Sequence, residues 1–123
     1  MATFIQDKQL RELAKALNNE VNVVIDDVAY SEDATPANNN VTNFGTEIGN
    51  RTSITRSRTS NSVLIETVRG ATDVVNTGSG DNLKRVMFVD SGSSAPLVLA
   101  TFPNILHTTG FDLSIQLELE VIR

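Results

Sequence analysis

Cysteine and tryptophan are both absent from this chain, and aromatic residues make up only 5% of its 123 residues. Without cysteine the protein has no disulfide framework, no thiolate ligand for zinc or an iron–sulfur cluster, and no thiol nucleophile. These absences fit a protein made in a reducing cytoplasm, and they give no support to redox chemistry.

Long apolar runs and an excess of positive charge are also missing. No apolar stretch approaches the roughly 20 residues of a membrane-spanning helix, and the N-terminal residues lack the basic and long apolar regions of a signal peptide. Lysine and arginine number 10 against 15 aspartates and glutamates, which gives a net charge of −5. Sequence-independent binding of nucleic acid needs a surplus of Lys and Arg on one face. We therefore expect neither nucleic acid nor a membrane as a partner.

The composition that remains is globular, with 40% hydrophobic and 20% charged residues. A chain of this length can bury a sufficient core without a metal or a disulfide. We therefore expect a single domain over residues 1–123.

The N-terminal region carries a helical pattern. Apolar side chains recur at the spacing i, i+3, i+4 and i+7, at Leu10, Leu13, Ala14 and Leu17. This period predicts a helix over about residues 4–18 whose apolar stripe covers a sheet and whose charged side chains are solvated. Thr3 with Gln6 resembles a capping box, and Asp7 is an alternative N-cap.

Most of the remaining chain alternates β-branched and apolar segments with turn signals such as "NTGSGD" and "DSGSSAP". The predicted strand segments lie at residues 21–30, around Ile54, and at residues 63–68, 71–75, 83–89, 97–102 and 111–121. Short strands after one helix indicate a mainly β (α+β) fold, with the N-terminal helix packed on an antiparallel β-sandwich or curved sheet.

The last predicted strand has two distinct faces. One face is apolar at every second residue from Phe111 to Val121, and we expect it to be buried. The other face carries Glu118 and Glu120, and it ends beside the apolar Ile122. An acidic stripe of this kind is either the solvated side of a sheet or a contact for arginines of a neighbouring subunit.

A long polar loop is predicted over residues 31–50, because Ser, Asp, Thr, Asn, Gly and Pro dominate that stretch. Loops of this length are usually functional or disordered, although Phe44 and Ile48 could pin part of it to the core. Arg51, Arg56 and Arg58 follow as the single basic cluster. These arginines could pair with carboxylates of the same chain or across a subunit interface.

The patterns expected of catalytic and metal sites are weak. His107 is the only histidine and has no neighbouring carboxylate in the sequence. "DSGSSAP" lacks the Gly-x-Ser-x-Gly elbow, and "TGSGDN" lacks the lysine and following helix of a phosphate-binding loop. Asp26 and Asp27 would point to opposite faces of a strand. We expect no catalytic residue, no cofactor and no metal site.

Several blocks in a characteristic order carry a family resemblance. "TNFGTEIGNRTSI" contributes Glu47, Ile48 and Arg51. "LKRVMFVDSGSSAPLVLATFP" contributes Met87, Phe88, Asp90 and Gly92. "ATFPNILHTTGFDLSIQLELEVI" adds an alternating strand near the end. With these blocks the chain resembles small bacteriophage tail-fibre or tail-collar (neck) proteins, including the N-terminal attachment domains of longer fibres.

The resemblance implies a non-enzymatic virion structural protein, a tail or neck adaptor or fibre-base component that assembles as a homo-oligomer. It implies a trimer or a ring, with other virion proteins as further partners and the virion as its location. A capsid decoration or cement protein is an alternative, and a small carbohydrate-binding β-sandwich is an alternative of another class. The residues expected at the oligomer or partner interface are Phe44, Glu47, Ile48, Arg51, Arg56, Arg58, Glu118, Glu120 and Ile122.

Overall fold

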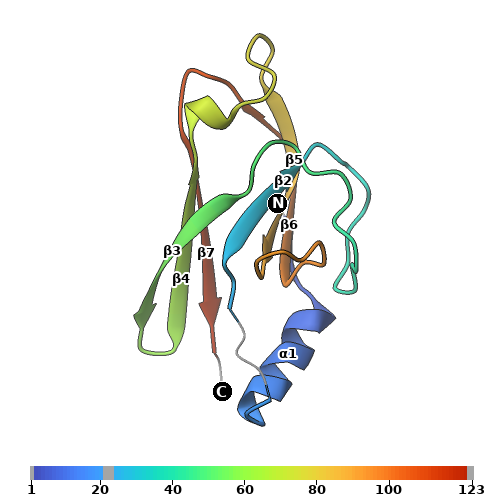
Figure 1. The fold of residues 1–123 in the computed structure, drawn as a ribbon, viewed down its shortest axis with the longest axis vertical. Coiled ribbons are helices and arrows are strands. Elements are labelled where there is room, and N and C mark those ends of the chain that lie inside the picture. The colour runs from blue at the N-terminus through green and yellow to red at the C-terminus, as the bar shows by residue number, and fades with distance from the viewer. Residues whose placement is uncertain (1, 21–23, 122–123) are drawn as a thin grey trace.

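The computed structural model of the protein describes residues 2–20 and 24–121. In that part of the chain, one antiparallel sheet curls into a half-barrel and one α-helix lies at its end (Figure 1). The strands are β1 (Ala2–Ile5), β2 (Asp27–Ser31), β3 (Thr52–Thr59), β4 (Ser62–Arg69), β5 (Asp81–Val89), β6 (Val98–His107) and β7 (Leu113–Glu120). The helices are α1 (Asp7–Leu17) and a short 3₁₀ helix, η1 (Ala71–Asp73). The prediction of a mainly β fold is confirmed, in its curved-sheet form.

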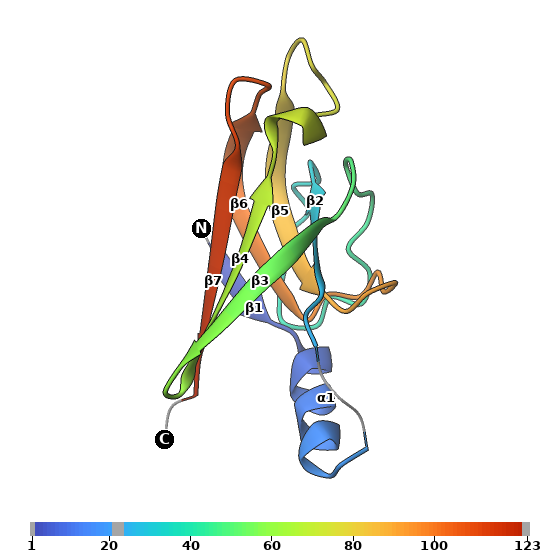
Figure 2. The ribbon, with the colours of Figure 1, turned by 60° about the vertical axis from the view of Figure 1, so that its left-hand side comes forward.

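The strands follow the order β1-β6-β5-β2-β3-β4-β7, so β1 and β7 are the two edges of the sheet. Figure 2 shows β3, β4 and β7 on one side of the half-barrel, facing β5 and β6 on the other. The main core fills the space between these sides, where Val86 and Phe88 of β5 pack with Ile65 of β4 and Leu117 of β7. The sheet therefore encloses its core by curling, because one layer of strands supplies both walls.

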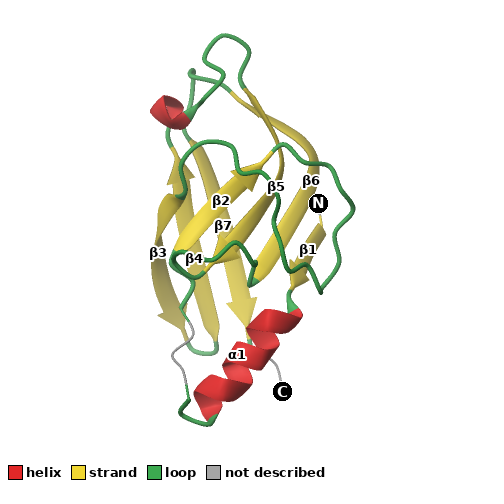
Figure 3. Ribbon diagram, turned by 45° about the vertical axis from the view of Figure 1, so that its right-hand side comes forward, coloured by secondary structure: helices red, strands yellow, loops and turns green. Residues whose placement is uncertain are grey.

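The long loop between β2 and β3 supplies a second layer on the outer face of the sheet. Phe44 of this loop packs with Met87, Val89 and Leu99 in a second buried cluster, and Figure 3 shows the loop lying across β2, β5 and β6. Strand β5 is thus covered on both faces, which explains its unbroken apolar run at residues 86–89.

Two buried polar side chains hold this loop in place. The Gln6 amide donates to the Asn38 carbonyl at 2.8 Å and accepts from the Val41 N–H at 2.6 Å. The Arg85 guanidinium donates to the Phe44 carbonyl at 3.3 Å and lies 5.7 Å from the centre of the Phe44 ring. The prediction that Phe44 pins the loop to the core is confirmed.

Some local predictions were wrong. Residues 4 and 5, predicted as the start of the helix, belong to β1 instead, because residues 2–5 pair with Val98–Thr101 of β6. Helix α1 therefore begins at Asp7, and its N-cap Gln6 makes no side-chain capping bond, so neither predicted cap is present. Residues 71–73 form η1 rather than a strand, since the Asp73 carboxylate closes the turn by accepting from the Gly70 N–H at 2.7 Å.

The final strand is shorter than its sequence pattern. Apolar side chains from Leu113 to Leu119 alternate as predicted with exposed polar ones. Phe111 and Val121 lie beyond the ends of β7 and are 43% and 75% exposed, so the buried apolar face does not extend to them. Of the strand predicted at residues 21–30, β2 includes only the part from Asp27, and residues 21–23 lie outside the described part of the chain.

Candidate interaction surface

The leucine stripe of α1, formed by Leu10, Leu13 and Leu17, is exposed at the surface. The sequence predicted the helix correctly, but the stripe does not lie on a face of the sheet, and no residue of α1 is buried. Leu10, Leu13 and Leu17 are 56%, 45% and 82% exposed. Figure 3 shows why, since α1 extends beyond the end of the strands.

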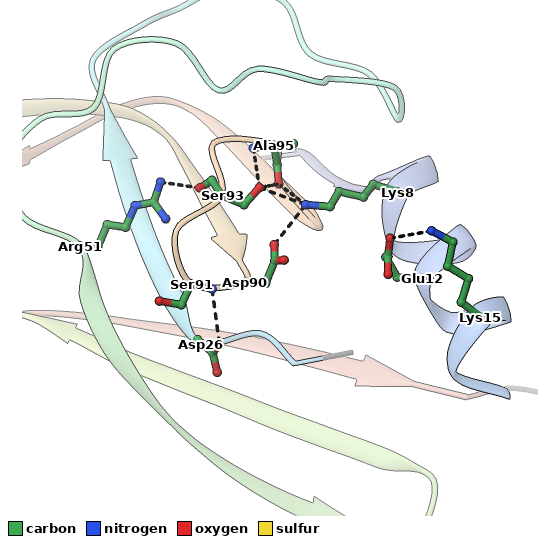
Figure 4. Close-up of polar contacts among 9 residues, drawn as sticks. All are labelled: Lys8, Glu12, Lys15, Asp26, Arg51, Asp90, Ser91, Ser93 and Ala95. Atoms are coloured by element: carbon green, nitrogen blue, oxygen red, sulfur yellow. Dashed lines mark hydrogen bonds and ion pairs between the residues drawn. The ribbon is translucent and has the colours of Figure 1, made fainter. Parts of the chain in front are cut away.

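A polar tether fixes the other side of α1. The Lys8 ammonium donates to the Asp90 carboxylate at 3.1 Å, to the Ser93 hydroxyl at 3.0 Å and to the Ala95 carbonyl at 3.4 Å, all on the loop between β5 and β6 (Figure 4). Because three acceptors from one loop converge on one ammonium, the helix is held in a defined orientation. Its leucines are therefore presented in a fixed direction.

The loop that receives Lys8 is itself braced. Arg51 donates to the Ser93 carbonyl at 2.6 Å and forms a two-pronged ion pair with Glu47, both bonds at 2.9 Å. The hydrogen-bonded Glu47 carboxylate raises the pKa of Arg51 above its ordinary value, against the opposing effect of partial burial. The Ser91 N–H also donates to Asp26 at 3.3 Å (Figure 4). This bracing makes the loop a firm support for α1.

Between α1 and the end of the half-barrel lies a groove of about 660 Å³. Leu10 and Leu13 form the helix wall, and Val63 and Leu119 belong to the strand wall. The remaining lining residues are Ile5, Gln9, Val24, Ile25, Arg56, Asn61, Ile65, Glu118, Glu120 and Val121. The groove thus combines an apolar lining with charged side chains, the arrangement expected of a protein-binding cleft.

A different kind of cluster lies at the opposite end of the half-barrel, where Arg69, Asp81 and His107 are all completely buried. Arg69 donates to Asp81 at 2.7 Å and to the Nδ1 atom of His107 at 2.8 Å. Because a guanidinium can only donate, Nδ1 must accept, and the ring proton is on Nε2. Nε2 then donates to the Phe111 carbonyl at 2.9 Å. Both ring nitrogens of the histidine are therefore engaged in structural contacts.

The Asp81 carboxylate is saturated with donors. It accepts from the backbone N–H groups of Val75 and Asn76, each at 2.9 Å, in addition to Arg69. Burial alone would raise the pKa of Asp81, but the two N–H groups and Arg69 outweigh it and hold the pKa below its ordinary value of 3.8. This carboxylate ties the loop after η1 to the buried arginine.

The lowered pKa of Asp81 predicts a loss of stability in acid. Since the folded pKa lies below the unfolded one, the stabilisation is complete above about pH 4 and is lost as pH falls through the folded pKa. We expect the free energy of unfolding, measured by urea titration at successive pH values, to fall below pH 4. Asp81→Asn should show a flatter acid limb, and an equally steep limb in that variant would contradict the assignment.

The structure places the predicted interface residues in different parts of the fold. Phe44 is 1% exposed, so its assignment to an interface is wrong, because its side chain contacts only the protein's own core. Ile48 also packs against the core, and its N–H donates to the Tyr30 carbonyl at 2.8 Å. Glu47 and Arg51 pair with each other and brace the loop between β5 and β6.

The other candidates lie nearer the groove. Arg56 lines it and contacts Asp26 at 3.9 Å, whereas Arg58 is exposed and donates to the Ser60 carbonyl at the β3–β4 turn. Glu118 and Glu120 are exposed side chains of β7 and also line the groove. Ile122 lies outside the described residues. The structure thus brings together Arg56, Glu118 and Glu120 from the predicted set.

The sequence predicted neither the exposure of the α1 leucines nor the buried cluster of Arg69, Asp81 and His107. The leucines of α1 were assigned to a helix that covers a sheet, because a stripe shows that a helix is amphipathic but not what covers it. The contact between Arg69, Asp81 and His107 joins positions up to 38 residues apart, which no local pattern reveals. A faint signal was present, since Arg69 directly follows an apolar strand segment.

Comparison of the chain with protein-family models, with curated proteins and with solved structures finds no match. Within residues 2–20 and 24–121, no three His, Cys, Asp or Glu side chains gather closely enough to hold a metal ion. Among the described helices, none is long and apolar enough to cross a membrane.

Proposed function

We propose that the protein is a non-enzymatic structural component of a bacteriophage virion, a tail or neck adaptor or fibre-base protein that acts by assembling as a homo-oligomer. The observation that carries the assembly role is the exposed leucine stripe of α1 beside an apolar groove. The virion setting rests on the resemblance of the sequence blocks to tail-fibre and collar proteins.

The leucine stripe has the geometry of a helix that docks into a groove. Leu10, Leu13 and Leu17 stand at i, i+3 and i+7, the spacing by which amphipathic helices bind apolar clefts. Isolated exposed leucines are normal, but a contiguous apolar surface rimmed by polar residues marks a protein interaction site. Tethering through Lys8 keeps this stripe presented, so docking requires little ordering of the helix.

A second copy of the chain is the occupant that fits this surface. The stripe and the groove lie on the same protomer, so symmetric copies can each offer a helix and receive one. Arg11 is exposed on α1, and Glu118 and Glu120 line the groove, which provides opposite charges for such a contact. Symmetric exchange of this kind closes into a dimer, trimer or ring.

Light scattering coupled to size-exclusion chromatography tests the proposal. We expect the wild-type protein to elute as an oligomer, with three copies as the value typical of a fibre base, and Leu13→Asp to weaken self-association at least about tenfold. Leu106→Asp is the matched control, because Leu106 is also 45% exposed but lies on β6 away from the groove.

Two results would contradict the proposal. One is a wild-type protein that stays monomeric across the whole concentration series. The other is a Leu13→Asp variant that keeps the wild-type mass while Leu106→Asp loses it. A decrease of the oligomer at high salt would further identify Arg11 and the groove carboxylates as contributors, since exposed charge pairs are screened by salt.

A further inference from the structure

Strand β7 is an edge strand with one unpaired side. It pairs with β4 over eight consecutive residues, from Leu113 to Glu120, with no irregularity in the register. Among the strands of residues 2–20 and 24–121 it has no second neighbour (Figure 2). Long regular edge strands are usually protected by proline, lysine or a bulge, because their free N–H and C=O groups accept another strand. Residues 113–120 contain no proline and no lysine.

The direction of the backbone groups of β7 follows from its pairing. The Val121 N–H donates to the Asn61 carbonyl at 2.9 Å. Since antiparallel pairs alternate between bonded and non-bonded residues, odd-numbered residues of β7 direct their backbone groups to β4 and even-numbered residues direct theirs to the open side. Ser114, Gln116 and Glu118 therefore present free N–H and C=O groups in the spacing that a new strand requires.

A cavity of about 210 Å³ lies inside the half-barrel next to this open edge. Leu113, Ile115 and Leu117 of β7 line it on one side, and Phe102 and Ile105 of β6 line it on the other. These two strands are connected in sequence but do not pair with each other. A strand added to β7 would therefore direct alternate side chains toward an apolar space, where burial favours apolar residues.

The outer face at this edge is acidic. Glu118 and Glu120 are exposed on β7, and Glu66 of β4 lies beside Gln116 in the register. None of these three carboxylates forms an ion pair with another described residue. The side chains that an added strand directs outward would thus meet uncompensated negative charge, which favours lysine and arginine.

The geometry points to β7 as an acceptor for an extended segment of another protein, in which apolar residues alternate with Lys or Arg, added to the sheet by backbone pairing. The apolar residues enter the cavity between β7 and β6, and the basic residues lie over the acidic face. A second copy is disfavoured as the occupant, because pairing β7 with β7 places two acidic stripes side by side. The edge shares Glu118 and Glu120 with the lining of the groove beside α1. Ser114 and Gln116, which offer backbone groups to the added strand, do not line that groove, so the inference does not depend on self-assembly through the leucine stripe.

The probe for this site is a fluorescently labelled, acetylated octapeptide of alternating lysine and valine, and its binding is followed by anisotropy. We expect saturable binding to the wild-type protein and at least about tenfold weaker binding to Gln116→Pro, because proline removes an N–H that faces the open edge. Gln116→Ala keeps that N–H and should bind within about twofold of the wild type. A glutamate–valine octapeptide should bind at least about tenfold more weakly.

A second measurement keeps the test valid if Gln116→Pro does not fold. A lysine–valine octapeptide with N-methylated alternate amides leaves the protein unchanged and cannot form the backbone pairs, so its binding should be lost. No saturable binding of the unmodified peptide, or equal binding of the N-methylated one, would overturn the inference. Loss of the wild-type oligomer in folded Gln116→Pro would overturn it in favour of a second copy at this edge. Leu13→Asp should bind the peptide normally, which separates this test from that of the helix.

Discussion

Arg69→Met is expected to lower the free energy of unfolding by about 3–5 kcal/mol, because it leaves the Asp81 carboxylate buried without its cation. The same change removes the donor to Nδ1 of His107, so two buried polar groups lose a partner at once. Methionine keeps the apolar stem of arginine but lacks the guanidinium group, so the measured loss combines the lost charge and hydrogen bonds with a cavity at this buried site. Equilibrium urea denaturation at pH 7 measures it.

Arg58→Met is the control for this prediction, because it makes the same chemical change at an exposed arginine of the β3–β4 turn. Its effect should stay within about 0.5 kcal/mol. The effects of Arg69→Met and Asp81→Asn should also be non-additive, since the two side chains share one contact of 2.7 Å. A loss of less than about 1 kcal/mol in Arg69→Met would show that this buried pair does little for stability.

The sequence predicted the strands best where one face of the strand is buried and the other is exposed to solvent. In β7 the alternation from Leu113 to Glu120 reports the two sides of the sheet directly. In β5 the apolar run at residues 86–89 predicted a strand without showing that a loop covers its second face. Burial on one or both faces is readable from local sequence, but the identity of the covering segment is not.

The predictions failed where partners distant in sequence decide the structure. Residues 4 and 5 were included in the predicted helix, yet they belong to β1 and pair with Leu99 and Val98 of β6, far along the chain. The same reason applies to Arg69, whose contacts with Asp81 and His107 cannot be inferred from residues near it. Tertiary contacts override local propensity in both cases.

Among the candidate interface residues, local sequence allowed exposure to be predicted for the charged side chains but not for the apolar one. Arg56, Glu118 and Glu120 were predicted as interface residues from their charge, and the structure places them at the groove. Phe44, also predicted as an interface residue, was the more apolar choice, and it proved to be part of the core. A charged side chain is rarely buried, so exposure could be predicted for the charged candidates, whereas an apolar side chain in a loop fits either location.

The Phe44→Ala variant therefore distinguishes a core position from an interface position for this side chain, and we expect it to have a large effect on stability. Removing a completely buried phenyl ring is expected to lower the free energy of unfolding by about 3–5 kcal/mol. The ring packs with Met87 and Leu99 and lies under the Arg85 guanidinium, so its loss also weakens the hold of the loop on the sheet.

Phe111→Ala is the matched control, since it deletes the same ring at a position that is 43% exposed, and it should cost less than about 1.5 kcal/mol. Urea denaturation gives both values, and light scattering should show the same mass as the wild type in each variant. A Phe44→Ala protein that keeps wild-type stability but loses its oligomer would contradict this assignment and return Phe44 to the interface. The expected result instead makes the loop a structural layer, because its one aromatic side chain serves the outer face of β5 rather than a partner.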